Sequence, residues 1–160
     1  MSVDSELVSG ASLEAWQRLL RAHSVIAREL DVELQGAHGM TLSDYDTLVQ
    51  LRDCESDALK MSELSRRTML TRSGMTRLVQ GLERDGLVER RSCDADARVS
   101  YAALTPHGEQ VLRAARETHH AGIRRTFADH FTEEEAAQLA ALLGQIPGAL
   151  EGDVPCGGGA

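Results

Sequence analysis

Arginine and hydroxyl side chains gather in residues 71–91 of a 160-residue chain whose formal net charge is −8. From Lys60 to Arg98 there are nine basic and six acidic residues, so this stretch carries +3 and the rest of the chain −11. A guanidinium group can donate two hydrogen bonds to one guanine edge, and hydroxyl groups can bond phosphate or base. This composition favours a surface that binds a polyanion while the remainder of the molecule repels it.

Apolar residues recur three and four positions apart in this segment and predict a helix whose buried face is Met75, Leu78, Val79 and Leu82. Thr71 stands where an N-cap is needed, and Asp85-Gly86 predicts the end of the helix because Gly accepts a left-handed turn. The opposite side then carries the residues that can reach a partner, which are Thr71, Arg72, Ser73, Thr76 and Arg77.

The segments on either side complete a recognisable unit. SELSRRT, residues 62–68, predicts a short helix before the basic one, and LVERR and VSYAAL predict an antiparallel hairpin after it. Two helices joined by a tight break and followed by a hairpin form a winged helix-turn-helix, whose second helix enters the major groove of DNA with its N-terminal half. In the wing, Arg90 and Arg91 lie where the first strand leaves the body, and Arg98 suits insertion into a narrow minor groove.

The remaining elements are predicted to be helical, which makes the fold class mostly α. Only 3% of residues are aromatic, and Ala, Leu, Glu and Arg dominate. Ser12 predicts the start of a first helix, and Ser43 with Asp46 the start of a second. Thr105-Pro106 and the capping box of Thr132 with Glu135 predict two further helices.

Composition also sets expectations about location and chemistry. No apolar run approaches the length of a membrane helix and the first residues lack a secretion signal, so we expect a cytoplasmic protein without membrane contact. Three widely spaced cysteines predict reduced thiols. The sequence contains no Ser/His/Asp order, phosphate loop or zinc spacing, so we expect neither an enzyme nor a cofactor.

Two blocks resemble the MarR family of bacterial transcription regulators: SELSRRTMLTRSGMTRLVQGLERDGLVERR and the wing DADARVSYAALTPHG. The resemblance implies a homodimer in which the first, fifth and sixth helices interlock and place two winged helices on a palindromic double-stranded DNA operator. It also implies repression. One departure is Ala97 beside Arg98, where many members have paired arginines, so one wing contact is missing.

The expected organisation follows. Residues 12–36 and 106–148 would form the dimerisation helices, residues 40–105 the winged helix-turn-helix lobe, residues 1–11 a flexible N-terminus and residues 149–160 a Gly-rich disordered tail. The terminal helices are apolar yet distant in sequence from the basic segment, and a two-fold partner would bury that apolar face.

Members of this family commonly bind small phenolic or aromatic acids between the dimerisation helices and the DNA-binding lobe. Positions in the first two helices that could line such a cleft and take a small aromatic effector are Trp16, His23, Tyr45, Asp46 and Arg52. The alternative is that Trp16 is a core or dimer-interface residue and that His23 is a hydrogen-bonded structural histidine.

Three alternatives remain open at this point. Cys93 lies beside Arg90 and Arg91, where cationic neighbours could lower its pKa and make it a redox switch. The pair His119-His120 invites a metal hypothesis, but adjacent helix positions point about 100° apart and cannot grip one ion as an i, i+4 pair would. The fold could also serve as a dimeric protein-interaction adapter without DNA binding.

Overall fold

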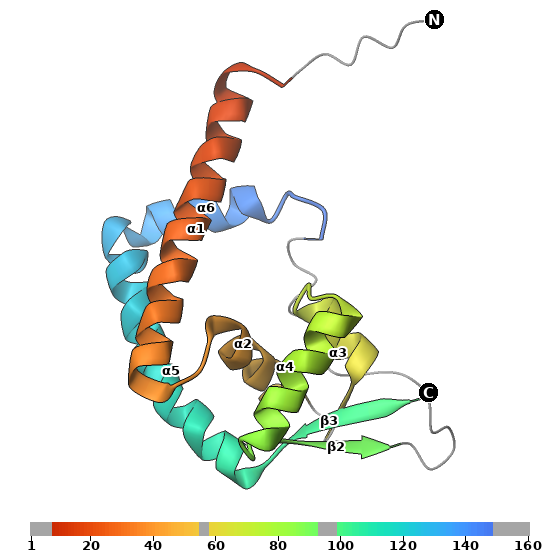
Figure 1. Cartoon of the computed structure of the whole chain (residues 1–160). Helices are drawn as coiled ribbons and strands as arrows, with labels where there is room; N and C mark the ends of the chain where they lie inside the picture. Colours follow the sequence, from red (N-terminus) through yellow and green to blue (C-terminus); the bar gives the residue numbers. More distant parts are fainter. Residues whose placement is uncertain (1–7, 55–57, 93–98, 149–160) are drawn as a thin grey trace, which may run out of the picture.

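The computed structural model describes residues 8–54, 58–92 and 99–148 (Figure 1). The elements follow in the order α1 (Gly10–His38), α2 (Leu42–Arg52), β1 (Leu59–Lys60), α3 (Met61–Arg67), α4 (Arg72–Arg84), β2 (Val88–Ser92), β3 (Ser100–Leu104), α5 (Pro106–Thr126), a short 3-10 turn η1 (Ala128–His130) and α6 (Glu133–Leu143). This confirms a mostly helical chain with a small wing. None of the described helices is both long and apolar enough to cross a membrane.

The lobe formed by α2, α3, α4 and the sheet holds the core. Its fully buried side chains include Leu48 of α2, Leu64 of α3 and Met75 and Val79 of α4, and Leu112 of α5 joins them. Burying apolar area of this kind supplies about 25 cal/mol per Å². The core therefore fixes α4 against the lobe by one face and leaves its opposite face outside.

The sheet is antiparallel in the order β1-β3-β2, with Val88 opposite Leu104 and Ser92 opposite Ser100. The predicted hairpin is confirmed as these two long strands. Strand β1 was not predicted: it is two residues long, with Leu59 paired to Ala102. Two residues show no alternation, so the sequence alone carried no signal for it.

The helix starts differ from prediction at two places. α1 begins at Gly10 rather than after Ser12. The prediction that Ser43 and Asp46 begin α2 was wrong, because Thr41 and Asp44 form the capping box two residues earlier. The Thr41 hydroxyl accepts from the Asp44 N–H at 3.1 Å, and the Asp44 carboxylate accepts from the Thr41 N–H at 2.9 Å.

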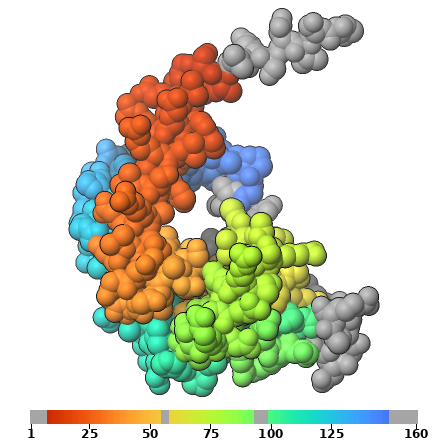
Figure 2. Space-filling model, viewed as in Figure 1, coloured from red at the N-terminus to blue at the C-terminus, as the bar shows by residue number. Residues whose placement is uncertain are grey.

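Outside the lobe, α1 and α6 leave large apolar areas uncovered. Only Leu30 and Leu34 of α1 are buried and no residue of α6 is, whereas Trp16 is 56% and Leu142 62% exposed. Figure 1 shows α6 passing behind α1 in that view, and Figure 2 shows the N-terminal half of α1 standing clear of the lobe. Exposed apolar helix faces of this size mark an interaction surface.

The lobe is joined to these outer helices by α5, which packs against both α1 and α2. α1 and α5 approach closely at Gly122, where an added Cβ would lie 2.5 Å from the Leu30 side chain. Beside this crossing, Arg125 of α5 pairs with Glu33 of α1 at 2.5 Å and with Glu29 at 3.4 Å. α5 is thus the mechanical link between the winged lobe and the exposed apolar helices.

Candidate nucleic-acid interface

The N-terminus of α4 is built by a side-chain cap, as predicted. The Thr71 hydroxyl accepts a hydrogen bond from the Gly74 N–H at 3.1 Å, and its oxygen lies 3.2 Å from that of Ser73. The other N–H groups of the first turn point outward, where the helix dipole favours an anion. Thr71, Arg72 and Ser73 are all exposed at this end.

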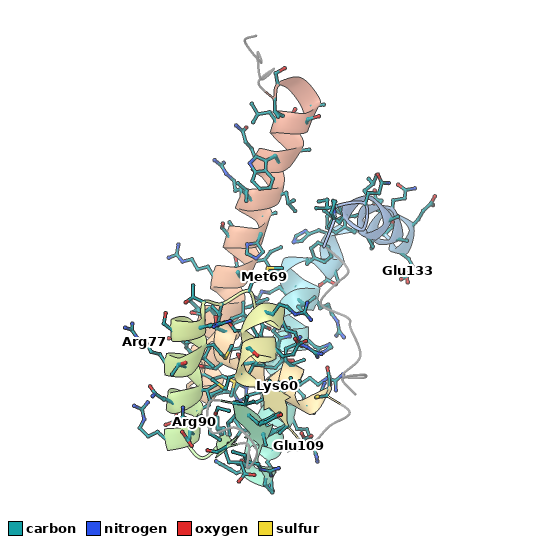
Figure 3. All side chains as sticks on the ribbon, turned by 90° about the vertical axis from the view of Figure 1, so that its right-hand side faces the viewer. Lys60, Met69, Arg77, Arg90, Glu109 and Glu133 are labelled. Carbon is teal, nitrogen blue, oxygen red and sulfur yellow. The ribbon has the colours of Figure 1, made fainter. Side chains whose placement is uncertain are left out.

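The arginines of α4's outer face are free to meet a partner. Arg72 and Arg77 are exposed, and neither forms an ion pair or a side-chain hydrogen bond with any part of the chain that the structure describes. Figure 3 shows Arg77 projecting outward from α4. Thr76 is half-buried, and its hydroxyl donates to the Arg72 carbonyl at 2.9 Å, so only its acceptor lone pair remains available. The structure brings Thr71, Arg72, Ser73 and Arg77 to one exposed surface.

The turn before α4 is held rigidly. The buried Ser65 hydroxyl donates to the Leu70 carbonyl at 2.5 Å, and the Leu70 N–H donates to the Ser65 carbonyl at 3.1 Å.

On the preceding helix, Glu63 accepts hydrogen bonds from Arg66 and Arg67, which lower the pKa of this carboxyl to about 2. The same carboxylate therefore neutralises part of the positive charge of α3.

In the wing, the two predicted arginines that the structure describes, Arg90 and Arg91, each have an acidic neighbour. Arg90 donates to Glu83 of α4 at 3.1 Å, and Arg91 donates through Nε to Glu89 at 2.8 Å. The arginines were predicted from the sequence, but these carboxylate partners were not. Residues 89 and 91 share a strand face by their spacing, which is a usable signal, whereas the contact of Glu83 with Arg90 depends on how the sheet meets α4. Arg98 and Cys93 lie outside the described residues.

The five residues predicted to line one ligand cleft fall into two groups. Trp16 and His23 line a groove of about 790 Å³ between α1, the end of α5 and α6, and no residue of α2 contributes to it. Tyr45 is buried instead in the contact between α2 and α5, where its ring stacks on His119 with centroids 4.2 Å apart. Trp16 and His23 thus lie apart from Tyr45 in this structure, because helix α2 packs on α5, away from the groove.

Tyr45, Asp46 and Arg52 form the second group, in which burial and nearby charges act on the Tyr45 hydroxyl. Burial raises the pKa of Tyr45, and Arg116 and Arg52 oppose this shift. Arg52 is bonded to Asp53 at 2.8 Å, and Asp46 is exposed beside Tyr45. Burial, together with the charge of His120, lowers the pKa of His119. The Tyr45 hydroxyl therefore lies within electrostatic range of two guanidinium groups, those of Arg116 and Arg52.

A model described as the MarR family matches residues 38–99. The solved structure of AbsC, a MarR family transcriptional regulator from Streptomyces coelicolor, is 31% identical, covers 93% of this chain and 100% of its own, and superposes with a TM-score of 0.81. Sco3205 from the same organism, a MarR family transcriptional regulator solved in complex with DNA, is 29% identical with coverages of 93% and 98% and a TM-score of 0.81.

Among curated sequences, the transcriptional repressor YetL of Bacillus subtilis (strain 168) is 29% identical over 108 residues, which are 68% of this chain and 64% of that protein. The chain spans between about half and two thirds of the first curated relatives that it matches. The likeness to AbsC and Sco3205 covers the outer helices as well as the winged lobe.

Proposed function

Because this chain belongs to the MarR family of DNA-binding transcriptional regulators, we propose that it represses transcription by binding a palindromic operator as a homodimer. One observation carries the proposal. In a chain with net charge −8, the outer face of α4 presents Arg72 and Arg77 without any described acidic partner. Positive charge left uncompensated at a helix N-terminus favours phosphate and base edges.

Different residues of α4 would contact base edges and phosphates. Arg77, on the second turn, is placed to donate two hydrogen bonds to a guanine edge in the major groove. Arg72, Ser73 and the free N–H groups near Thr71 suit phosphate oxygens, which fix the register of the helix on the duplex. In the wing, Arg90 and Arg91 would exchange their carboxylate partners for phosphates, and Arg98 would enter the minor groove.

The homodimer is proposed from the uncovered apolar surface. The 790 Å³ groove between α1 and α6 is lined by aromatic and aliphatic residues such as Trp16, Phe127 and Leu142. A second copy of the chain would cover this surface on both protomers at once, as an isologous interface requires. Residues 12–36 and 106–148 would then form the dimerisation region. Two lobes held this way can address two half-sites about one helical turn apart.

Release by a small aromatic or phenolic acid completes the proposal. Arg52 and Arg116 both act electrostatically on the Tyr45 hydroxyl, and this combination of a ring with guanidinium groups suits an aromatic carboxylate. The position between α2 and α5 joins the lobe to the outer helices. A ligand held there would shift the lobe relative to the dimer.

The test is fluorescence anisotropy of the purified protein with the DNA upstream of its own gene and with a scrambled duplex, over a series of salt concentrations. We expect preferential binding to the upstream DNA and an affinity that falls steeply as salt rises. Arg77→Ala should cost about 1–3 kcal/mol and relax specificity at one base position. The matched control is Arg113→Ala, which removes an exposed arginine of α5.

Weak binding of both duplexes, with no sequence found by selection from a random pool, would overturn the proposal and favour a protein-interaction adapter. Equal operator affinity of Arg77→Ala and the wild type would overturn the role of α4 alone.

A further inference from the structure

The turn between α3 and α4 holds an unusual residue, Met69. Its side chain is 89% exposed, more than any other large apolar side chain in the described part of the chain. Its backbone has φ of 56°, and within the same described residues no other non-glycine residue has a positive φ. A left-handed conformation costs a residue with a Cβ roughly 1 kcal/mol, and glycine adopts it freely.

The Met69 side chain does not pack against the hydrophobic core. It is absent from the buried core and from the half-buried residues packed against that core. The turn is instead held by hydrogen bonds of its neighbours: the two that join Ser65 with Leu70, and the one that the Thr68 hydroxyl donates to the Leu64 carbonyl at 2.8 Å. Removing the side chain should therefore leave the turn in place.

The Met69 side chain lies next to the end of α4 that is proposed to bind DNA. Met69 lies two residues before Thr71, which caps α4, and three before Arg72, whose guanidinium has no described acidic partner. Figure 3 shows it at the end of the lobe where α4 begins. A flexible thioether chain at this point is within reach of whatever the first turn of α4 contacts. In the complex proposed above, that is the edge of a major groove.

We propose that Met69 is a specificity-determining residue that packs against the 5-methyl group of a thymine at the edge of the major groove. This rests on the proposed DNA binding. Base edges in the major groove offer apolar surface mainly through the thymine methyl, so an apolar side chain there distinguishes thymine from the other bases. Contact with DNA would also remove the exposed methionine from water.

The experiment begins with duplexes selected by the wild-type protein from a random pool, which tests the proposed function by itself. Met69→Gly is then compared with the wild type on a selected duplex and on a scrambled one. We expect about a three- to tenfold loss of affinity for the selected duplex, as for one buried methylene or two, and little change on the scrambled duplex. Met69→Leu should restore most of the loss, because it keeps the apolar bulk.

Thermal unfolding separates this effect from damage to the fold. Met69→Gly relieves the left-handed backbone, so its melting temperature should equal or exceed that of the wild type. Sedimentation should show an unchanged oligomeric state. A variant that melts lower or changes its oligomeric state would show that Met69 serves the fold or the dimer, and the proposal would fall.

The decisive step replaces thymine by deoxyuridine, one position at a time, in the selected duplex. At one position, loss of the methyl should weaken the wild type three- to tenfold and leave Met69→Gly unaffected. If no position shows this coupling, or if Met69→Gly binds the selected duplex as tightly as the wild type, the assignment is wrong while sequence-specific binding by the wild type still stands.

Discussion

Gly108 in the first turn of α5 lies where the wing joins the helix that leads to the outer helices. It is buried, and its N–H donates to the Thr105 hydroxyl at 2.9 Å. A Cβ added there would lie 2.1 Å from the Leu87 carbonyl oxygen and 2.8 Å from a methyl of Leu104. That same carbonyl accepts a hydrogen bond from the Thr105 N–H at 3.0 Å, so it cannot move away without breaking this hydrogen bond between the wing and α5.

The perturbation is Gly108→Ala. In an open helix interior, this change stabilises by about 0.5–1 kcal/mol because alanine loses less backbone entropy on folding. Here the obstacle is main chain, which must retreat by about 1.3 Å, from 2.1 to 3.4 Å, to reach ordinary contact. Overpacking of this kind costs about 1–3 kcal/mol. We expect the upper end of that range, since neither Leu87 nor α5 can shift alone. For a chain of this size, that corresponds to a fall in melting temperature of about 6–12 °C.

The assay is thermal and urea unfolding of the wild type and two variants at one protein concentration, because the stability of the proposed dimer depends on concentration. Gly81→Ala in α4 is the matched control: its added Cβ would meet only the flexible end of Arg84 at 4.0 Å, so it should stabilise. If Gly108→Ala melts at or above the wild type while Gly81→Ala stabilises, the main chain at Leu87 yields without cost, and the predicted overpacking is refuted.

Three further predictions follow from the described contacts. Glu83→Gln should free Arg90 and raise affinity for any duplex by about two- to fivefold at low salt, the magnitude typical of an exposed ion pair. The control is Glu109→Gln, which removes the same charge from α5 and should raise affinity less. Fluorescence anisotropy measures both affinities. Burial lowers the pKa of His119, so the unfolded chain binds its proton first as pH falls below about 6.5. The free energy of unfolding should therefore decrease from pH 7.5 to 5.5, and less in His119→Phe, which keeps the ring against Tyr45; equal decreases in denaturant titrations would contradict this. Thr71→Ala should cost about 1 kcal/mol of stability through the lost cap, whereas the exposed Ser73→Ala should stay within a few tenths.

Those elements that local chemistry specifies could be predicted from the sequence. The caps at Thr71, Thr105 and Thr132 all lie where hydroxyl, proline and glutamate spacing placed them. The buried face of α4 was also predicted, because its apolar spacing repeats over three turns; only Leu78 of that face is half-buried rather than fully buried. These features depend on residues within one turn of each other, which a sequence displays directly.

The sequence predicted contacts between distant segments poorly. Nothing local signals that Leu59 pairs with Ala102, or that Tyr45 turns toward His119 rather than toward the groove of Trp16. α2 has apolar residues on more than one side, so its spacing did not decide which face packs on α5. The predicted ligand set consequently joined residues that the fold separates.

The acidic partners of the wing arginines change how charge in this region should be understood. By sequence alone, Arg90 and Arg91 count as free positive charges that could bind DNA. In the structure each is paired with a carboxylate, whereas Arg72 and Arg77 are not. Attraction to any duplex is then weakened at the wing, because phosphate must displace Glu83 and Glu89 there. It is full at α4, where the proposed hydrogen bonds to base edges depend on the DNA sequence. Such a distribution should lower non-specific binding more than specific binding, since the proposed wing contacts are to phosphates and contribute mainly to the former.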